Sequence, residues 1–162
     1  GGASPITNYF HNSDPSQMYA LDIVKLNALG NRANGFFPAE LSRYKVFGEV
    51  VYSPCNGVIA GVSDGLPDNP PREADRKNTA GNHIVLDCGE TRVLLAHLMS
   101  ESITVKAGQF VKVNTVMARV GNSGDTAEPH LHIQAWKIDK ADKAVAMTFN
   151  GEFLVMNRTF KN

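Results

Sequence analysis

The segment PHLHIQ, residues 129–134, alternates polar and apolar side chains in the pattern of a β-strand. Because successive side chains of a strand point to opposite faces, His130, His132 and Gln134 would share one face. The two imidazoles would then stand about 7 Å apart along the strand. One of them can bind a metal while its neighbour handles a proton on a metal-activated water. The alternative is a pair of half-exposed histidines on a sheet surface.

Short runs of residues with high strand propensity occur both before and after this segment, with glycine between them. We expect strands at residues 19–24, 48–53, 57–62, 83–86, 91–98, 103–105, 110–113, 116–120, 131–136, 144–149 and 153–156. Strands of this length and spacing favour an antiparallel β-sheet or sandwich. Residues 38–47 predict a short helix, because proline suits an early helical position. Residues 26–38 and 63–80 predict long irregular segments, and long loops in compact domains are often functional.

Composition indicates an ordinary globular domain. The 162 residues suffice for one core, and 43% of them are hydrophobic and 20% charged. Sixteen basic and sixteen acidic residues balance, which argues against a nucleic-acid partner. No stretch approaches the roughly 20 apolar residues that span a bilayer. The chain begins with Gly1 instead of Met, which is compatible with a removed export signal or with a membrane anchor or further domain in a longer parent.

The two cysteines, Cys55 and Cys88, each lie beside an expected strand. Disulfides persist in oxidising compartments, so we expect these cysteines to pair if the chain is exported. The alternative is two buried free thiols.

Two more residues stand out at positions where polar side chains need partners. His97 ends the apolar run of residues 93–98, where a lone histidine is usually packed and hydrogen-bonded. Asp22 lies inside YALDIV, residues 19–24, and a carboxylate there is costly to bury without a partner. Together with His130 and His132 these residues supply what a catalytic zinc needs, namely about three N/O ligands, an open water position and a base.

Several motifs in order along the chain carry a resemblance to a known family. Residues 121–132, GNSGDTAEPHLH, resemble the closing motif of the M23 peptidases, also called the LytM or lysostaphin-like family. Residues 105–121 are similar to the strands that precede that motif. Residues 81–98 are similar to the central strands, including the family's His-Leu pair, and residues 52–58 to its first strand-turn-strand unit. The ordered combination is specific, whereas His-x-His alone would not be.

The resemblance implies a mostly β fold of the LytM type, also described as duplicated-hybrid-motif-like. Such a fold has an antiparallel sheet or sandwich, long loops around a groove and little helix. The resemblance covers residues 48–136 well and residues 8–24 more loosely. We therefore expect a single peptidase domain over residues 1–162, with the core at about 48–136. Residues 1–24 would be an N-terminal metal-ligand segment and residues 137–162 a C-terminal strand extension.

The resemblance also implies roles for individual residues. Asp22 matches the metal-binding aspartate, and His132 matches the second, metal-binding histidine of the His-x-His pair. His97 and His130 match two histidines that do not bind the metal and act on the activated water and on the transition-state oxyanion. The resemblance leaves open which of these two is the base.

The remaining metal ligand departs from the family pattern. The family has a histidine four residues before the aspartate, and this chain has Met18 there, a poor zinc ligand. We expect His11, eleven residues before Asp22, to reach the same Zn²⁺ ion after an insertion. His83 alternates with apolar residues of an expected strand, at a position that the family does not use as a ligand. The alternative to His11 is a site in which zinc binding is weakened or lost.

The function implied is a zinc-dependent endopeptidase that hydrolyses peptide bonds of bacterial peptidoglycan, in the stem or the cross-bridge, through a metal-activated water. One Zn²⁺ per chain, peptidoglycan peptides as partners, an extracytoplasmic location and a monomeric state are expected with it. Loops 26–38 and 63–80 would wall the substrate groove.

Two other functions remain open at this stage. The first is a degenerate LytM-like domain that binds and activates another cell-wall hydrolase, which Met18 at the usual ligand position leaves open. A lipoyl- or biotinyl-like carrier also has such strands, and Asp142-Lys143-Ala144 is similar to its lysine hairpin. In carriers, however, the lysine precedes the second V..G motif, whereas here it follows both. A carrier would also leave the three histidines near the motif unexplained.

Overall fold

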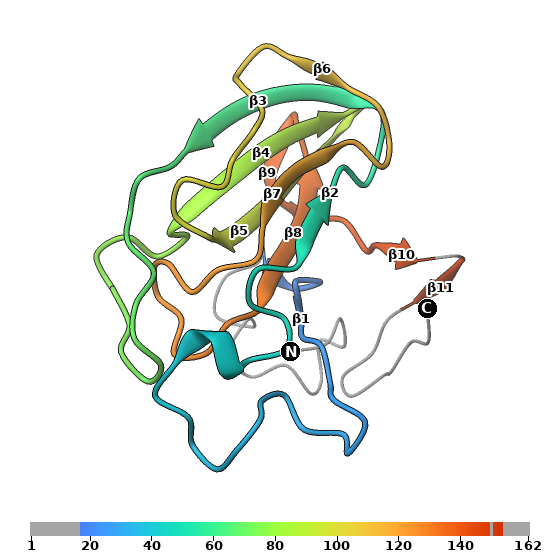
Figure 1. Cartoon of the computed structure of the whole chain (residues 1–162). Helices are drawn as coiled ribbons and strands as arrows, with labels where there is room; N and C mark the ends of the chain where they lie inside the picture. Colours follow the sequence, from blue (N-terminus) through green and yellow to red (C-terminus); the bar gives the residue numbers. More distant parts are fainter. Residues whose placement is uncertain (1–16, 150, 154–162) are drawn as a thin grey trace.

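The computed structural model describes residues 17–149 and 151–153, and the fold is almost entirely β (Figure 1). In chain order the elements are β1 (Leu21–Ile23), a 3-10 turn η2 (Leu41–Arg43), β2 (Val50–Tyr52), β3 (Gly57–Ser63), β4 (Asn82–Cys88), β5 (Thr91–Leu98), β6 (Phe110–Val111), β7 (Val116–Arg119), β8 (Leu131–Lys137), β9 (Lys140–Ala144), β10 (Thr148–Phe149) and β11 (Glu152–Phe153). Every strand pair is antiparallel, which confirms the predicted fold class. In this described part, no helix has the length and apolar character needed to cross a membrane.

A seven-stranded sheet forms the body of the fold (Figure 1). Its strands follow the order β1-β8-β5-β4-β3-β6, and β9 also pairs with β8. A separate ribbon of β2 and β7 crosses in front of this sheet, and a single bridge between Leu98 and Val120 joins the two (Figure 1). The end of β5, where His97 lies, is therefore held between the main sheet and the segment that follows β7.

The core lies between the sheet and this ribbon. Strand β4 shows the underlying alternation, since Asn82, Ile84 and Leu86 are fully buried while His83 and Val85 are half-buried. Met117 and Ala118 of β7 belong to the same buried cluster. Strands β5 and β8 occupy central positions and are buried over much of their length, so polar side chains on them are placed inside the protein.

Four local predictions were wrong or incomplete. Residues 38–47 form only the turn η2, because Tyr44 and Val46 are both buried and Tyr44 bridges to Ala33 in extended backbone. Residues 103–105 form no strand: the Thr104 backbone N–H donates to the Met117 carbonyl at 2.8 Å, and the Ser102 and Thr104 hydroxyls also bond backbone carbonyls. The run 144–149 is divided between the end of β9 and β10. Of the expected strand 153–156, residue 153 lies in β11 and the rest lies outside the described residues.

Cys55 and Cys88 form a disulfide, with Cα atoms 6.0 Å apart. The bond joins the turn before β3 to the end of β4 and closes a loop with a sequence separation of 33 residues. In the chain-entropy model, a cross-link of this span stabilises the folded state by about 3–4 kcal/mol.

Replacing both cysteines by serine is therefore expected to lower the free energy of unfolding by about 3–4 kcal/mol. Urea unfolding of the oxidised protein and of the Cys55→Ser/Cys88→Ser variant measures the difference. Reductant should destabilise the wild type and leave the variant unchanged. Equal midpoints for the oxidised and the reduced wild type would contradict the expectation.

An ion pair on β4 and β5 gives the fold a predictable response to acid. Arg92 donates from Nε and Nη2 to the two carboxylate oxygens of Asp87, at 2.6 and 2.9 Å, across paired strands. These hydrogen bonds hold the pKa of Asp87 below its ordinary value. Because the folded pKa is the lower one, the stabilisation is present above the unfolded pKa of about 4 and is lost as pH falls through the folded pKa.

Asp87→Asn should thus lower the free energy of unfolding by about 1 kcal/mol at pH 7. The difference between the wild type and Asp87→Asn should shrink as pH falls below about 4. Denaturant midpoints at several pH values measure it, and a difference that grows in acid would contradict the assigned sign.

Candidate active site

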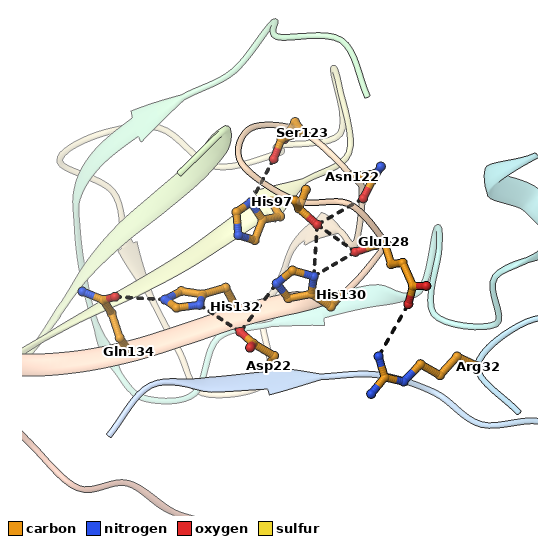
Figure 2. A network of polar contacts seen from close by, with 10 residues as sticks. Asp22, Arg32, His97, Asn122, Ser123, Glu128, His130, His132 and Gln134 are labelled. Carbon is orange, nitrogen blue, oxygen red and sulfur yellow. Dashed lines mark hydrogen bonds and ion pairs between the residues drawn. The ribbon is translucent and has the colours of Figure 1, made fainter. Parts of the chain in front are cut away.

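The pairing of β1 with β8 brings together two residues that are 110 positions apart in the sequence. Asp22 lies opposite His132 in this antiparallel register. The Asp22 Oδ1 atom is 3.0 Å from His132 Nδ1 (Figure 2). Both side chains point to the face on which the alternation of residues 129–134 places polar groups. The structure thus unites the carboxylate and the imidazole that the sequence assigns to metal binding.

His97 reaches the same place from the end of β5. Its backbone adopts φ +60°, a left-handed conformation that is uncommon for a residue other than glycine and is often found at functional sites. Its ring centroid lies 4.7 Å from that of His130 and 5.8 Å from that of His132. The ring is buried, and Nδ1 donates a hydrogen bond to the carbonyl oxygen of Ser123, at 2.9 Å.

His130 immediately precedes β8 and completes a compact group. One ring nitrogen from each of His97, His130 and His132 lies within 4.8 Å of the other two. His130 Nδ1 donates to the carbonyl oxygen of Glu128 at 2.9 Å, and its Nε2 is 3.5 Å from Asp22 Oδ1 (Figure 2). The three histidines and Asp22 therefore share one site, as the sequence predicts.

Backbone carbonyls set the tautomers of His97 and His130. A carbonyl oxygen can only accept a hydrogen bond, so Nδ1 carries the proton in both rings. In the neutral ring Nε2 then has an available lone pair. Burial, with the neighbouring His130, lowers the pKa of His97 to about 3, and burial also lowers the pKa of His130. Both rings are consequently neutral at pH 7, with Nε2 able to accept a proton.

His132 is oriented by Gln134, two residues further along β8. His132 Nε2 lies 2.9 Å from Gln134 Oε1, and Nδ1 lies 3.0 Å from Asp22 Oδ1, a carboxylate oxygen that accepts from it when no metal is present. With a metal between Nδ1 and Asp22, Nε2 would carry the ring proton and donate to the Gln134 amide oxygen. An imidazole nitrogen and a carboxylate oxygen side by side are typical zinc donors, and hydrogen bonds of the kind Gln134 makes commonly orient a ligand histidine. The residues present therefore fit a bound zinc ion.

The remaining predicted ligand cannot be placed, because His11 lies outside the described residues. Met18, at the position where the family has its first ligand histidine, lies within the described residues and is 37% exposed. His83 lies on β4, where Nδ1 donates to the carbonyl of Gly81 at 2.8 Å, and it is not part of the histidine group.

Sequence reasoning missed the groups that hold the histidines in place. The Ser123 backbone carbonyl accepts a hydrogen bond from His97. The Ser123 hydroxyl donates to the Leu98 carbonyl at 2.7 Å and accepts from the backbone N–H of Asn82 at 2.9 Å. Gly81 packs so closely on Ser123 that a Cβ atom would collide with its backbone. The polar Gln134 within a buried strand was a signal, visible in the sequence, of a partner for His132. The backbone carbonyls that orient His97 and His130 could not be found in this way, because every residue has a carbonyl.

Loop 63–80 packs against the segment that carries Ser123. Asp68 accepts the backbone N–H of Asn122 at 2.6 Å and that of Ser100 at 3.1 Å. Asn69 Nδ2 donates to the carbonyl of Gly124 at 2.7 Å. The loop thus supports the turn that orients His97.

A comparison with known protein families gives a match over more than half of the chain. The model described as "Peptidase family M23" matches residues 44–146. A protein of Haemophilus influenzae named an uncharacterized metalloprotease is 36% identical over 99 residues, which make up 57% of this chain and 20% of that protein. The chain thus spans about a fifth of this curated relative's length.

Solved structures with a similar fold include a zinc-containing peptidase from Vibrio cholerae. It is 27% identical, with a TM-score of 0.47 over 61% of this chain and 26% of that one. The catalytic domain of the antimicrobial peptidase lysostaphin from Staphylococcus simulans is 22% identical. Its TM-score is 0.46 over 71% of this chain and 85% of the other.

Proposed function

Because the chain belongs to peptidase family M23, we propose that it is a zinc-dependent endopeptidase that hydrolyses peptide bonds of bacterial peptidoglycan, in the stem or the cross-bridge. The observation that carries the proposal is the Asp22–His132 pair beside two neutral histidines, the buried His97 and the half-buried His130. A metal ligand pair next to two proton acceptors is the donor set that metal-assisted hydrolysis requires.

We assign the metal to His132, Asp22 and His11. The first two residues face each other across β1 and β8, and His11 is the expected third ligand. When bound, zinc would lower the pKa of a water molecule to about 7 and polarise the peptide carbonyl.

His97 and His130 would manage the protons. Each presents an unprotonated Nε2 because its Nδ1 proton is committed to a backbone carbonyl. One of them takes the proton of the attacking water as general base. A nitrogen that has accepted a proton becomes a donor, able to bond a developing oxyanion or to protonate the leaving amine.

The disulfide supports an extracytoplasmic location. Disulfides persist outside the reducing cytosol, in the periplasm, on the cell surface or in secreted proteins. The Cys55–Cys88 bond is consistent with any of these places. We accordingly propose peptidoglycan peptides as the partners, and a monomer as the working form.

The second candidate is a degenerate domain that binds the wall and activates another hydrolase. Met18 at the usual ligand position favours it. Removal and restoration of the metal separates the two functions. The proposal expects about one zinc per chain and new amine ends in purified peptidoglycan. Both should be lost after dialysis against a chelator and regained with zinc. Binding to peptidoglycan without zinc and without cleavage would support the second candidate.

A further inference from the structure

A hollow of about 500 Å³ shares Glu128 with the surroundings of the histidine group. It is lined by residues of the segment 31–38, together with Tyr44 and Glu128. Glu128 connects the two places, because its backbone carbonyl accepts the Nδ1 proton of His130 while its side chain points away from the rings towards Arg32 (Figure 2). The hollow is thus connected through one residue to the histidines proposed to act on the peptide bond.

Two aromatic side chains in the wall of the hollow are held out in water. Phe36 is 91% exposed and Phe37 is 69% exposed, with the two rings edge to face at 4.5 Å. Phe37 has φ +48°, an unfavourable conformation for a bulky residue, and the Arg72 guanidinium donates to its carbonyl at 3.2 Å. Exposed aromatic surface and a strained backbone both cost stability. Their occurrence together beside the site indicates a surface used for contact.

One ion pair supplies the charge of the hollow. Arg32 Nη1 is 3.5 Å from Glu128 Oε2, and the side chains are 61% and 45% exposed. An ion pair this exposed contributes at most about 1 kcal/mol, so a ligand can replace it easily. A ligand with a single charge would compensate one member of the pair and displace the other. A ligand with both charges on one carbon can compensate Arg32 and Glu128 together.

We propose that this hollow binds an α-amino-acid zwitterion of the substrate, with its carboxylate on Arg32, its ammonium on Glu128 and its apolar part against Phe36. The substrate class is then a peptide that carries a free amino-acid centre close to the bond cleaved. The role as a substrate subsite rests on the proposed function, whereas the binding of the zwitterion does not. A neutral sugar could also pack on the aromatic rings, but it carries no charges to pair with Arg32 and Glu128.

Titration of the isotope-labelled whole chain by NMR tests the binding without requiring hydrolysis. The probes are phenylalanine, its N-acetyl derivative, which is an anion, and its amide, which is a cation. Phenylalanine should shift the signals of Phe36, Phe37 and Tyr44 and bind at least about fivefold more tightly than either derivative. Loss of one charge-assisted hydrogen bond corresponds to a change of about this size.

Arg32→Gln and Glu128→Gln should each remove this preference for phenylalanine. The matched controls are Lys25→Gln and Glu49→Gln, which break an ion pair of similar exposure outside the lining of the hollow and should retain the preference. Equal binding of the three probes, binding of N-acetylglucosamine in place of phenylalanine, or no shift at all would each overturn the proposal. The zinc and cleavage measurements above are independent, so either proposal can fail alone.

Discussion

His132→Ala is expected to lower the rate of peptide hydrolysis at least about 1000-fold and to remove most of the bound zinc. The change deletes the imidazole that lies 3.0 Å from the Asp22 carboxylate, and these two groups are the proposed metal donors of β8 and β1. A factor of 1000 corresponds to about 4 kcal/mol of transition-state stabilisation, which is within what a catalytic metal supplies. Metal analysis per chain and mass spectrometry of peptidoglycan fragments measure the two losses. Asp22→Asn should act in the same direction.

The control is His83→Ala, which removes a half-buried histidine from β4 outside the histidine group. It should keep both zinc and hydrolysis. Because His132 is buried, the unfolding midpoint of each variant must be measured alongside activity. Full zinc content and unchanged turnover in a folded His132→Ala protein would refute the ligand assignment.

His97→Ala is expected to reduce kcat by about 10²–10⁴-fold, the usual range for loss of a general acid or base, while zinc content stays near one per chain. The reason is that its Nε2 is a proton acceptor oriented by the Ser123 carbonyl, outside the proposed ligand set. His130→Ala should behave alike, since the Glu128 carbonyl orients it in the same way. The measurement combines steady-state kinetics with metal analysis.

The double variant sharpens this second prediction. Groups that act as a unit lose activity non-additively, so His97→Ala/His130→Ala should be scarcely slower than the worse single variant. Ring nitrogens of all three histidines lie within 4.8 Å of each other, so the geometry would also allow His97 or His130 to bind the metal. Loss of zinc in His97→Ala alone would identify His97 as a ligand and not as a proton carrier.

The fold could be predicted best where the chain is buried in the middle of the sheet. Strand β5 has the predicted bounds, Thr91–Leu98, because a central strand requires an apolar run that stands out against its neighbours. The 3-10 turn at Leu41–Arg43 and the irregular residues 103–105 were harder. There the outcome depends on tertiary contacts and on side-chain hydrogen bonds, which compete with local propensity.

The site could be predicted as a set of residue types but not as an oriented arrangement. Histidine spacing and the aspartate at position 22 indicate the chemistry, and the register of β1 on β8 brings them together. The tautomers depend on the carbonyls of Ser123 and Glu128, which any residue could supply. His11 stays a prediction, because it lies outside the described residues.

Strand β1 is three residues long, lies at one end of the sheet order and pairs with β8. Asp22 is its middle residue, so metal binding by Asp22, as proposed, would be thermodynamically linked to the docking of β1 on β8. A zinc ion that stabilises the docked strand would bind the docked state more tightly by the same factor. Removal of zinc should then loosen this edge before the buried strands, and protease sensitivity near residue 21 would report metal occupancy.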